Sequence, residues 1–276
     1  MNVWFGDPSR PVGVSTPDGD IAREVAGLFR PLLLPGHAGG EPDIHLRRTG
    51  KGFRLVEPAS GEAPRQFYGL PRALARLEYR VVLLLQGRWA DHAFLHGAGL
   101  DLGGEALLWM GPSGAGKSSL TLAASLAGWK VLGDDCLMVD AHARVRGIPR
   151  LLKVVGPQLK RMGLEKSRTV LPHPEVSEVW WDPARSGGWA EGAYPVHAVA
   201  RIAWVRETGP PRLAPMSASE GVRFLLDNLL PAGLSPAASL DRLLGVARAA
   251  RFVDLRFHEA KRGLEALTAW AGATQG

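Results

Sequence analysis

The spacing of hydrophobic residues changes along the chain and predicts an alternation of strands and helices. Short apolar runs bounded by glycine, proline or aspartate predict strands at residues 43–48, 53–57, 66–69, 106–110, 129–132 and 198–205. Apolar residues that recur at three- and four-residue intervals predict helices at residues 21–34, 71–85 and 118–126. This alternation indicates a protein of the α/β class.

The last third of the chain carries two capping signals. Ser217 and Glu220 have the S-x-x-E spacing of a capping box in front of an apolar stretch that ends at residue 230. Ser235 followed by Pro236 predicts the start of another helix. The remaining elements expected here are a strand and a final helix, at residues 252–257 and 258–270.

The elements divide into two expected domains. Residues 1–94 predict a small α+β domain that contains no recognisable motif, with partner binding or assembly as its expected roles. Residues 95–276 predict a nucleotide-binding domain, because a phosphate-binding loop lies between an apolar strand and a helix in this part of the chain.

That loop runs from Gly111 to Ser118 and has the G-x-x-x-x-G-K-S pattern, known as Walker A. Its glycines give the backbone room to wrap a polyphosphate with N–H groups at the start of a helix. Lys117 is expected to reach the β- and γ-phosphates of ATP, and the Ser118 hydroxyl to bind Mg²⁺. The predicted nucleotide-binding residues are Gly111, Pro112, Ser113, Gly114, Ala115, Gly116, Lys117, Ser118 and Ser119.

Asp134 and Asp135 follow the next apolar run and are the candidate catalytic carboxylates. A parallel sheet would place them at the edge where the phosphates bind. One carboxylate could then hold Mg²⁺ and the other accept a proton from an attacking hydroxyl. A polar hairpin turn is the structural alternative, and Asp140 at the end of the run 137–139 is a rival metal ligand.

His96 precedes the strand that leads into the loop. If residues 100–101 pair back through a turn at Gly103 and Gly104, this histidine returns to the phosphate end of the strand. A single histidine is more often a structural hydrogen-bond partner, so both readings stay open.

The order His96-Gly97, GPSGAGKSS and LGDD resembles the catalytic core of the HPr serine kinase/phosphorylase family, whose fold is related to ATP-dependent phosphoenolpyruvate carboxykinase. The resemblance covers residues 95–140. It implies that His96 lies near the reacting phosphate, that Lys117 and Ser118 bind ATP and Mg²⁺, and that Asp134 and Asp135 serve as metal ligand and general base.

One feature of that family is missing. Its kinases carry an acidic, glycine-containing signature after the aspartates, whereas RVRGIPRLLKV at residues 144–154 lacks the acid. This departure argues against HPr as the acceptor and against phosphorolysis. Kinase chemistry requires only the nucleotide site and a base, and remains the expectation.

Composition narrows the class of protein. The 276-residue chain is 46% hydrophobic and 22% charged, which is ordinary for a globular protein with a buried core. Its start, MNVWFGDPSR, has no signal pattern, and its apolar runs are shorter than the ~20 residues of a membrane helix, so we expect a cytoplasmic protein. Cys136 is the only cysteine, which excludes an internal disulfide and a cysteine-rich metal site.

The formal charge of +6 is concentrated in residues 141–170, where eight Lys or Arg minus one Glu give +7. This basic segment contains no Phe, Tyr or Trp and so lacks the stacking surfaces of single-strand binders; nucleic acid is not an expected partner. A positive field would favour an acidic acceptor, and a solvated basic face is the alternative. The cations are Arg144, Arg146, Arg150, Lys153, Lys160, Arg161, Lys166 and Arg168.

Residues 172–195 are rich in Pro and Gly and contain Trp180, Trp181 and Trp189. A long irregular stretch inside a domain is typical of a functional loop. Alternatively, the tryptophans fill a crevice in the core.

Two functions remain open. The first is ATP- and Mg²⁺-dependent transfer of the γ-phosphoryl group to a hydroxyl of a protein, peptide or small molecule. The second is a nucleotide-binding regulatory module without transfer activity. A GTPase or an ABC-type ATPase is not expected, because neither N-K-x-D nor L-S-G-G-Q occurs in the chain. The expected partners are the nucleotide and the acceptor, and homo-oligomerisation is left open.

Overall fold

The computed structural model describes residues 1–37, 39–155, 160, 162, 164, 171–172, 178–231 and 234–272. Contacts between Cα atoms divide the chain into two units. The first contains Met1–Trp89 and Pro149–Trp181, and the second contains Ala90–Ile148 and Asp182–Gly276. The expected division into residues 1–94 and 95–276 stays a prediction. The contact-based division differs from it by assigning residues 149–181 to the first unit and residues 90–94 to the second.

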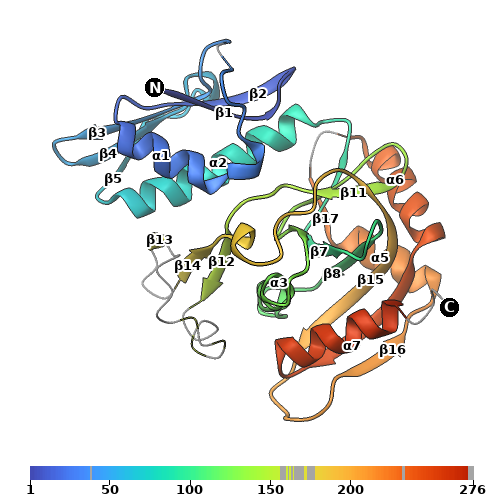
Figure 1. The fold of residues 1–276 in the computed structure, drawn as a ribbon. Helices are drawn as coiled ribbons and strands as arrows, with labels where there is room; N and C mark the ends of the chain where they lie inside the picture. The colour runs from blue at the N-terminus through green and yellow to red at the C-terminus, as the bar shows by residue number, and fades with distance from the viewer. Residues whose placement is uncertain are drawn as a thin grey trace. The chain divides into compact units, whose positions relative to one another are not determined.

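The first unit is built on a five-stranded sheet in which the strands follow their sequence order. All neighbouring strands are antiparallel except β2 and β3, which are parallel and connected through helix α1. Figure 1 shows α1 and α2 along the same side of this sheet. The elements are β1 (Asn2–Asp7), β2 (Arg10–Ser15), α1 (Gly19–Leu28), η1 (Arg30–Leu32), β3 (Ile44–Thr49), β4 (Gly52–Val56), η2 (Pro58–Ser60), β5 (Arg65–Phe67) and α2 (Leu70–Arg88).

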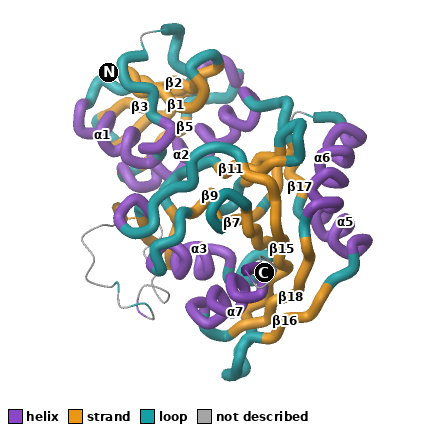
Figure 2. The backbone as a smooth tube through the Cα atoms, turned by 45° about the vertical axis from the view of Figure 1, so that its right-hand side comes forward, coloured by secondary structure: helices purple, strands orange, loops and turns teal. Residues whose placement is uncertain are grey.

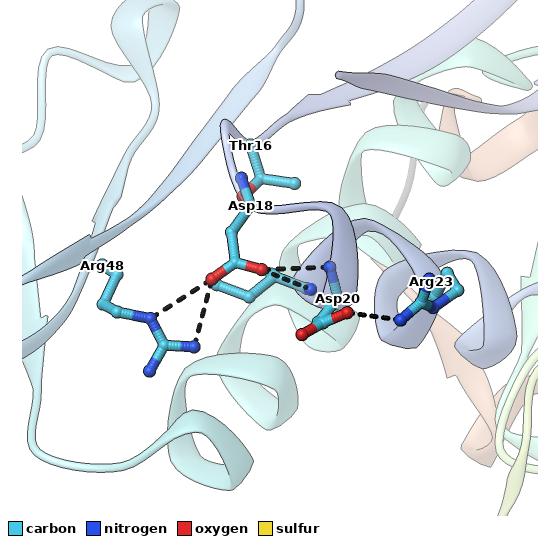
Figure 3. A network of polar contacts seen from close by, with 6 residues as sticks. Thr16, Asp18, Asp20, Arg23 and Arg48 are labelled. Carbon is cyan, nitrogen blue, oxygen red and sulfur yellow. Dashed lines mark hydrogen bonds and ion pairs between the residues drawn. The ribbon is translucent and has the colours of Figure 1, made fainter.

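Asp18 determines where α1 begins (Figure 3). Its carboxylate accepts hydrogen bonds from the backbone N–H groups of Asp20 (3.0 Å) and Ile21 (3.2 Å), which have no partner within the helix. The Arg48 side chain donates to the same carboxylate from β3 at 3.1–3.2 Å. The Ile21 N–H and the Arg48 guanidinium together keep the pKa of Asp18 below its usual value.

The first unit also contains a three-stranded sheet from later in the chain, in the order β12-β14-β13. Its strands are β12 (Leu152–Val155), β13 (Leu171–Pro172) and β14 (Glu178–Trp181). Just before β12, the Leu151 N–H donates to the Leu28 carbonyl at 3.1 Å. Glu78 of α2 is buried and forms ion pairs with both Arg150 and Lys153, the latter at 2.8 Å. These contacts attach the returning segment to the N-terminal helices.

The second unit is built on a ten-stranded mixed sheet, in the order β17-β6-β10-β11-β15-β8-β7-β9, in which β18 also pairs with β15 and β16 pairs with β18. Its strands are β6 (Ala93–Leu95), β7 (Gly97–Asp101), β8 (Ala106–Met110), β9 (Val131–Gly133), β10 (Leu137–Val139), β11 (Arg144–Gly147), β15 (Tyr194–Trp204), β16 (Arg212–Pro215), β17 (Leu229–Leu230) and β18 (Arg251–Phe257). Its helices are α3 (Lys117–Leu126), η3 (Pro183–Arg185), α5 (Ala218–Asp227), α6 (Pro236–Ala249) and α7 (Ala260–Gly272).

Helices cover both faces of the β8–β15–β18 part of this sheet. Figure 2 shows α3 and α7 on one side of β15 and β18, and α5 and α6 on the other. Successive side chains of β8 point to opposite faces of the sheet and so pack against both helix layers. Leu108 and Met110 join the core formed with α5 and α6, whereas Trp109 points toward α3. This explains why every residue of β8 is buried.

Most of the expected elements are present, and the capping box of Ser217 and Glu220 is confirmed. Two expected helices are shorter: the first ends at Leu28, and α5 ends at Asp227, so that Leu229 and Leu230 form β17 instead. The β1–β2 hairpin was not foreseen. The expected parallel sheet beside the loop is mixed: β15 is parallel to β8, whereas β7 is antiparallel to both β8 and β9.

The tryptophans at residues 180, 181 and 189 are between 1% and 8% exposed, which confirms that they belong to core regions. Within the described residues, no helix combines the length and hydrophobicity required to cross a membrane.

Candidate functional site

The loop predicted to bind phosphate connects β8 to α3, in the order strand, loop, helix. A Cβ atom at Gly111 would lie 2.7 Å from the Ile202 carbonyl oxygen of β15. Gly116 has a φ of +97°, and a Cβ atom there would lie 2.7 Å from the Phe257 ring at the end of β18. Both glycines are therefore required by the close approach of neighbouring strands, and Gly116 also by its left-handed backbone.

Hydrogen bonds hold the rest of the loop in place. The Ala115 N–H donates to the Pro112 carbonyl at 3.1 Å, and the Ala115 carbonyl accepts from the Trp204 N–H at 3.0 Å. Ala115 is buried, whereas Pro112, Ser113 and Gly114 are exposed. The tip of the loop is thus open while its base is fixed to β15.

Lys117 is the first residue of α3 and is only 7% exposed. Its ammonium group donates to the carbonyl oxygens of Gly111 (2.7 Å) and Pro112 (3.3 Å), so the side chain folds back over the loop. Its backbone carbonyl accepts from Thr121 Oγ1 (3.0 Å) and Trp109 Nε1 (3.3 Å). The lysine charge is therefore held at the loop itself, and Ser118 and Ser119 follow it as half-buried residues.

Strand pairing brings His96 to the same edge of the sheet as the loop. Gly97 lies opposite Met110 in the β7–β8 ladder, so His96 and Gly111 both lie just beyond that pair. Gly99 lies opposite Gly133 in the β7–β9 ladder, so Asp134 and Asp135 leave β9 at this edge as well. The hairpin at Gly103 and Gly104 that the sequence suggested is therefore present.

His96 and Asp135 are in direct contact. His96 Nδ1 lies 3.2 Å from the Asp135 carbonyl oxygen, and because a carbonyl can only accept, this nitrogen carries the proton. Nε2 of a neutral ring is then the acceptor. His96 is half-buried, so a structural and a functional role are both compatible with its position.

The two aspartates differ in their surroundings. Asp134 is only 2% exposed, whereas Asp135 is half-buried. Asp135 has a φ of +68°, one of two positive values among the described non-glycine residues. Left-handed backbone of this kind is uncommon outside glycine and costs free energy, and it is found frequently at functional sites.

Asp140, the rival metal ligand, lies elsewhere. In the β6–β10 ladder, Leu137 pairs with Leu95 next to His96, and Asp140 follows the opposite end of the ladder. Its carboxylate accepts from the His142 N–H (2.8 Å), the Arg144 N–H (2.9 Å) and Arg144 Nε (3.0 Å). Burial raises the pKa of Asp140, but these hydrogen bonds outweigh it and keep the pKa below its usual value. Asp140 thus stabilises the β10–β11 hairpin.

Three of the eight cations in the basic segment pair with carboxylates of the chain. Arg144 pairs with Asp140, and Arg150 and Lys153 pair with Glu78. Lys160 is exposed, whereas Arg161, Lys166 and Arg168 lie outside the described residues. The electrostatic role suggested for the whole segment therefore cannot involve all eight cations equally.

A magnesium ion bound with a nucleotide needs few protein ligands, because phosphate oxygens and water complete its octahedral shell. No cluster of three or more His, Cys, Asp or Glu suited to a metal occurs in the described part of the chain. Ser118 lies in the first turn of α3 and Asp134 directly follows β9, at the same edge of the sheet. A hydroxyl and a carboxylate fit this sparse ligand set.

Sequence reasoning missed the residues that support the loop from β15 and β18: Ile202, Trp204 and Phe257. Both strands were predicted from their apolar patterns. The parallel pairing of β15 with β8, and of β18 with β15, was not predicted, because nothing local in the sequence specifies which distant strand lies beside the loop.

No family model matches this chain. A curated HPr kinase/phosphorylase from Geobacillus thermodenitrificans is 28% identical over 123 residues, which is 40% of this chain and 40% of that protein. A solved structure, the Hpr(Ser) kinase/phosphatase from Coxiella burnetii, aligns with a TM-score of 0.33 and 14% identity over 66% of this chain and 96% of that one. The resemblance seen in the motifs is thus confirmed by sequence similarity: over 123 residues, this chain is similar to an HPr kinase/phosphorylase.

Proposed function

We propose that this protein is an ATP- and Mg²⁺-dependent kinase that transfers the γ-phosphoryl group to a hydroxyl. The observation that carries this proposal is the convergence of Gly111–Ser118, His96 and Asp134–Asp135 at one edge of the sheet. In α/β proteins, ligands bind beyond the carboxyl ends of such strands. The similarity to an HPr kinase/phosphorylase supports the same reaction class.

The loop residues bind the triphosphate in this proposal. Backbone N–H groups of residues 113, 114 and 116–119 surround the β-phosphate at the start of α3. Lys117 turns from the Gly111 and Pro112 carbonyls, now 2.7 and 3.3 Å from its ammonium group, to the β- and γ-phosphates. Ser118 and Asp134 would hold Mg²⁺, which would neutralise phosphate charge.

Asp135 is the proposed general base. It takes the proton of the acceptor hydroxyl, whose oxygen forms a bond to the γ-phosphorus while the bond between that phosphorus and the bridging oxygen of ADP breaks. His96, bound to the Asp135 carbonyl, positions this residue. The proposed acceptor is a serine of a protein or peptide, or a small molecule, and we do not propose HPr or phosphorolysis because the acidic signature is missing.

The first test of this proposal is Lys117→Ala, measured by calorimetric titration with Mg-ATP. Removing the only side-chain charge that the loop directs at phosphate should weaken binding by at least about tenfold, or about 1.4 kcal/mol. Lys130→Ala is the matched control, because Lys130 is exposed and lies outside the loop. Equal affinities in a folded Lys117→Ala variant and the parent would remove the loop from the mechanism.

A second candidate is a regulatory module that binds nucleotide without transferring phosphate. The near-complete burial of Asp134 favours it, because an inaccessible carboxylate cannot meet a metal without local rearrangement. Incubation with labelled ATP and candidate acceptors, followed by mass spectrometry, separates the two. Tight ATP binding without labelled product from any acceptor would favour the regulatory module.

A further inference from the structure

An open hollow lies beside the ends of β15 and β18, next to the phosphate loop. Side chains and backbone from the segment that follows β15, from β16 and from the end of β18 form its walls. The residues used below are Val205, Glu207, Gly209, Arg212, Arg256 and His258.

The hollow and the phosphate loop share the same strand ends. The Trp204 N–H binds the Ala115 carbonyl of the loop at 3.0 Å, and the Val205 N–H binds the Phe257 carbonyl at 2.8 Å. Trp204 Nε1 donates to the His258 carbonyl at 2.9 Å, and His258 Nδ1 lies 3.0 Å from the Val205 carbonyl oxygen. Trp204 and Phe257 support the loop, and the residues that follow them in the chain, Val205 and His258, line the hollow.

The order of the strands gives the bound nucleotide a direction. β8 lies between β7 and β15. His96 directly precedes β7 and Asp134 directly follows β9, on one side of the loop, and β15 and β18 are on the other side. If the γ-phosphate faces Asp134 and Asp135, the nucleoside must point toward β15 and β18. Two strand spacings of about 4.8 Å each separate β18 from β8, which is within the reach of a nucleotide.

The chemistry of the hollow suits a base and a ribose. Arg212 and Arg256 lie directly opposite each other in the β16–β18 pair and are both exposed. Like charges at this position are unfavourable, and within the described residues neither arginine has an ion-pair partner. Guanidinium groups stack on nucleobases, and the Glu207 carboxylate can accept hydrogen bonds from ribose hydroxyls or an exocyclic amine.

We propose that this hollow holds the nucleoside part of the nucleotide whose phosphates bind at Gly111–Ser118. The proposal rests on the proposed function for nucleotide binding but not on phosphoryl transfer. It predicts that the protein binds Mg-ATP more tightly than Mg-tripolyphosphate, because only ATP carries a nucleoside.

Gly209→Phe tests the proposal by filling the hollow. A Cβ atom at Gly209 meets no atom within 4 Å, and its φ lies outside the left-handed range, so a side chain can be added without strain. Calorimetric affinity for Mg-ATP should fall by at least about tenfold while affinity for Mg-tripolyphosphate changes less than about twofold. Gly50→Phe is the matched control. A Cβ atom at Gly50 also meets no atom within 4 Å, and Gly50 lies in the turn between β3 and β4 in the first unit.

Arg212→Ala with Arg256→Ala is the second variant and should show the same selective loss. Equal losses for ATP and tripolyphosphate would overturn the proposal, because the arginines would then bind phosphate. Unchanged ATP affinity in both variants would overturn it as well, as would equal affinity of the parent for the two ligands. Binding of neither ligand by the parent would instead refute the nucleotide site at the loop and with it both proposals.

Discussion

At the scale of single residues, the site is defined by backbone geometry as much as by side-chain chemistry. Gly116 and Asp135 both have positive φ values, and they flank the region where phosphates are proposed to bind. The glycine was recognisable from the motif. The backbone of Asp135 was not, because an aspartate at a strand end is equally typical of an ordinary turn.

Asp135→Asn is expected to separate chemistry from folding. Asparagine tolerates left-handed backbone, so the free energy of unfolding should change little, whereas the amide cannot accept a proton. Phosphoryl transfer should fall by ~10² or more with ATP affinity retained, the usual scale for a lost general base. Asp134→Asn should instead weaken the Mg²⁺ dependence.

Asp135→Gly is the control for backbone strain, since it keeps the left-handed conformation without a carboxyl group. Transfer at the parent rate in both Asp135 variants would contradict its role as base. In that case Asp134 would be the next residue to test, because Asp140 is committed to its hairpin.

At the scale of elements, local signals were reliable where caps or a motif were present. The capping box, the loop and the strands at 106–110 and 252–257 were all predicted within one or two residues. The end of α5 was not, because Leu229 and Leu230 continue an apolar pattern although they pair with β6 as β17. Short strands such as β1 and β2 are stabilised by partners distant in sequence, and no local pattern reveals these partners.

Ser217→Ala should destabilise the second unit through α5. The Ser217 hydroxyl accepts from the Glu220 N–H at 3.3 Å, and Glu220 Oε2 accepts from the Ser217 N–H at 2.8 Å. Losing a serine cap typically costs about 1 kcal/mol, whereas Ser217→Gly should cost only a few tenths. Urea denaturation compares the two variants, and equal stability of Ser217→Ala and the parent would show that α5 is held by packing alone.

At the scale of the whole molecule, the chain passes between its two units three times. The sequence suggested that the basic segment creates a positive field for an acidic acceptor. Two of its cations, Arg150 and Lys153, instead form ion pairs with Glu78 within the first unit. Seventy-two residues separate Arg150 from Glu78, and the sequence gives no sign that they meet. A run of charged residues therefore predicts the sign of the local electrostatic field. It does not predict which carboxylates will pair with the cations in the folded protein.

Glu78→Gln is expected to destabilise the first unit strongly. Burial raises the pKa of Glu78, but the charges of Arg150 and Lys153 outweigh it, so the pKa in the folded protein lies below the usual 4.5. The pair therefore contributes stability above about pH 4.5, and this contribution is lost as the pH falls through the lower folded value. Removing one partner of a buried ion pair typically costs about 3–5 kcal/mol.

Hydrogen exchange measured by mass spectrometry can localise this loss. Glu78→Gln should speed exchange in residues 1–89 and 149–155 and leave the second unit unchanged, and the parent should show the same pattern as the pH falls below 4.5. The control is Glu62→Gln, whose ion pair with Arg65 is about half exposed and should contribute less than about 1 kcal/mol. Glu78→Leu combined with Arg150→Leu should recover part of the stability lost in Glu78→Gln, because the double variant leaves neither Glu78 nor Arg150 as a buried charge without its partner. Equal exchange in the Glu78→Gln and Glu62→Gln variants would mean that the returning segment is held by contacts such as the Leu151–Leu28 hydrogen bond and not by the buried ion pairs.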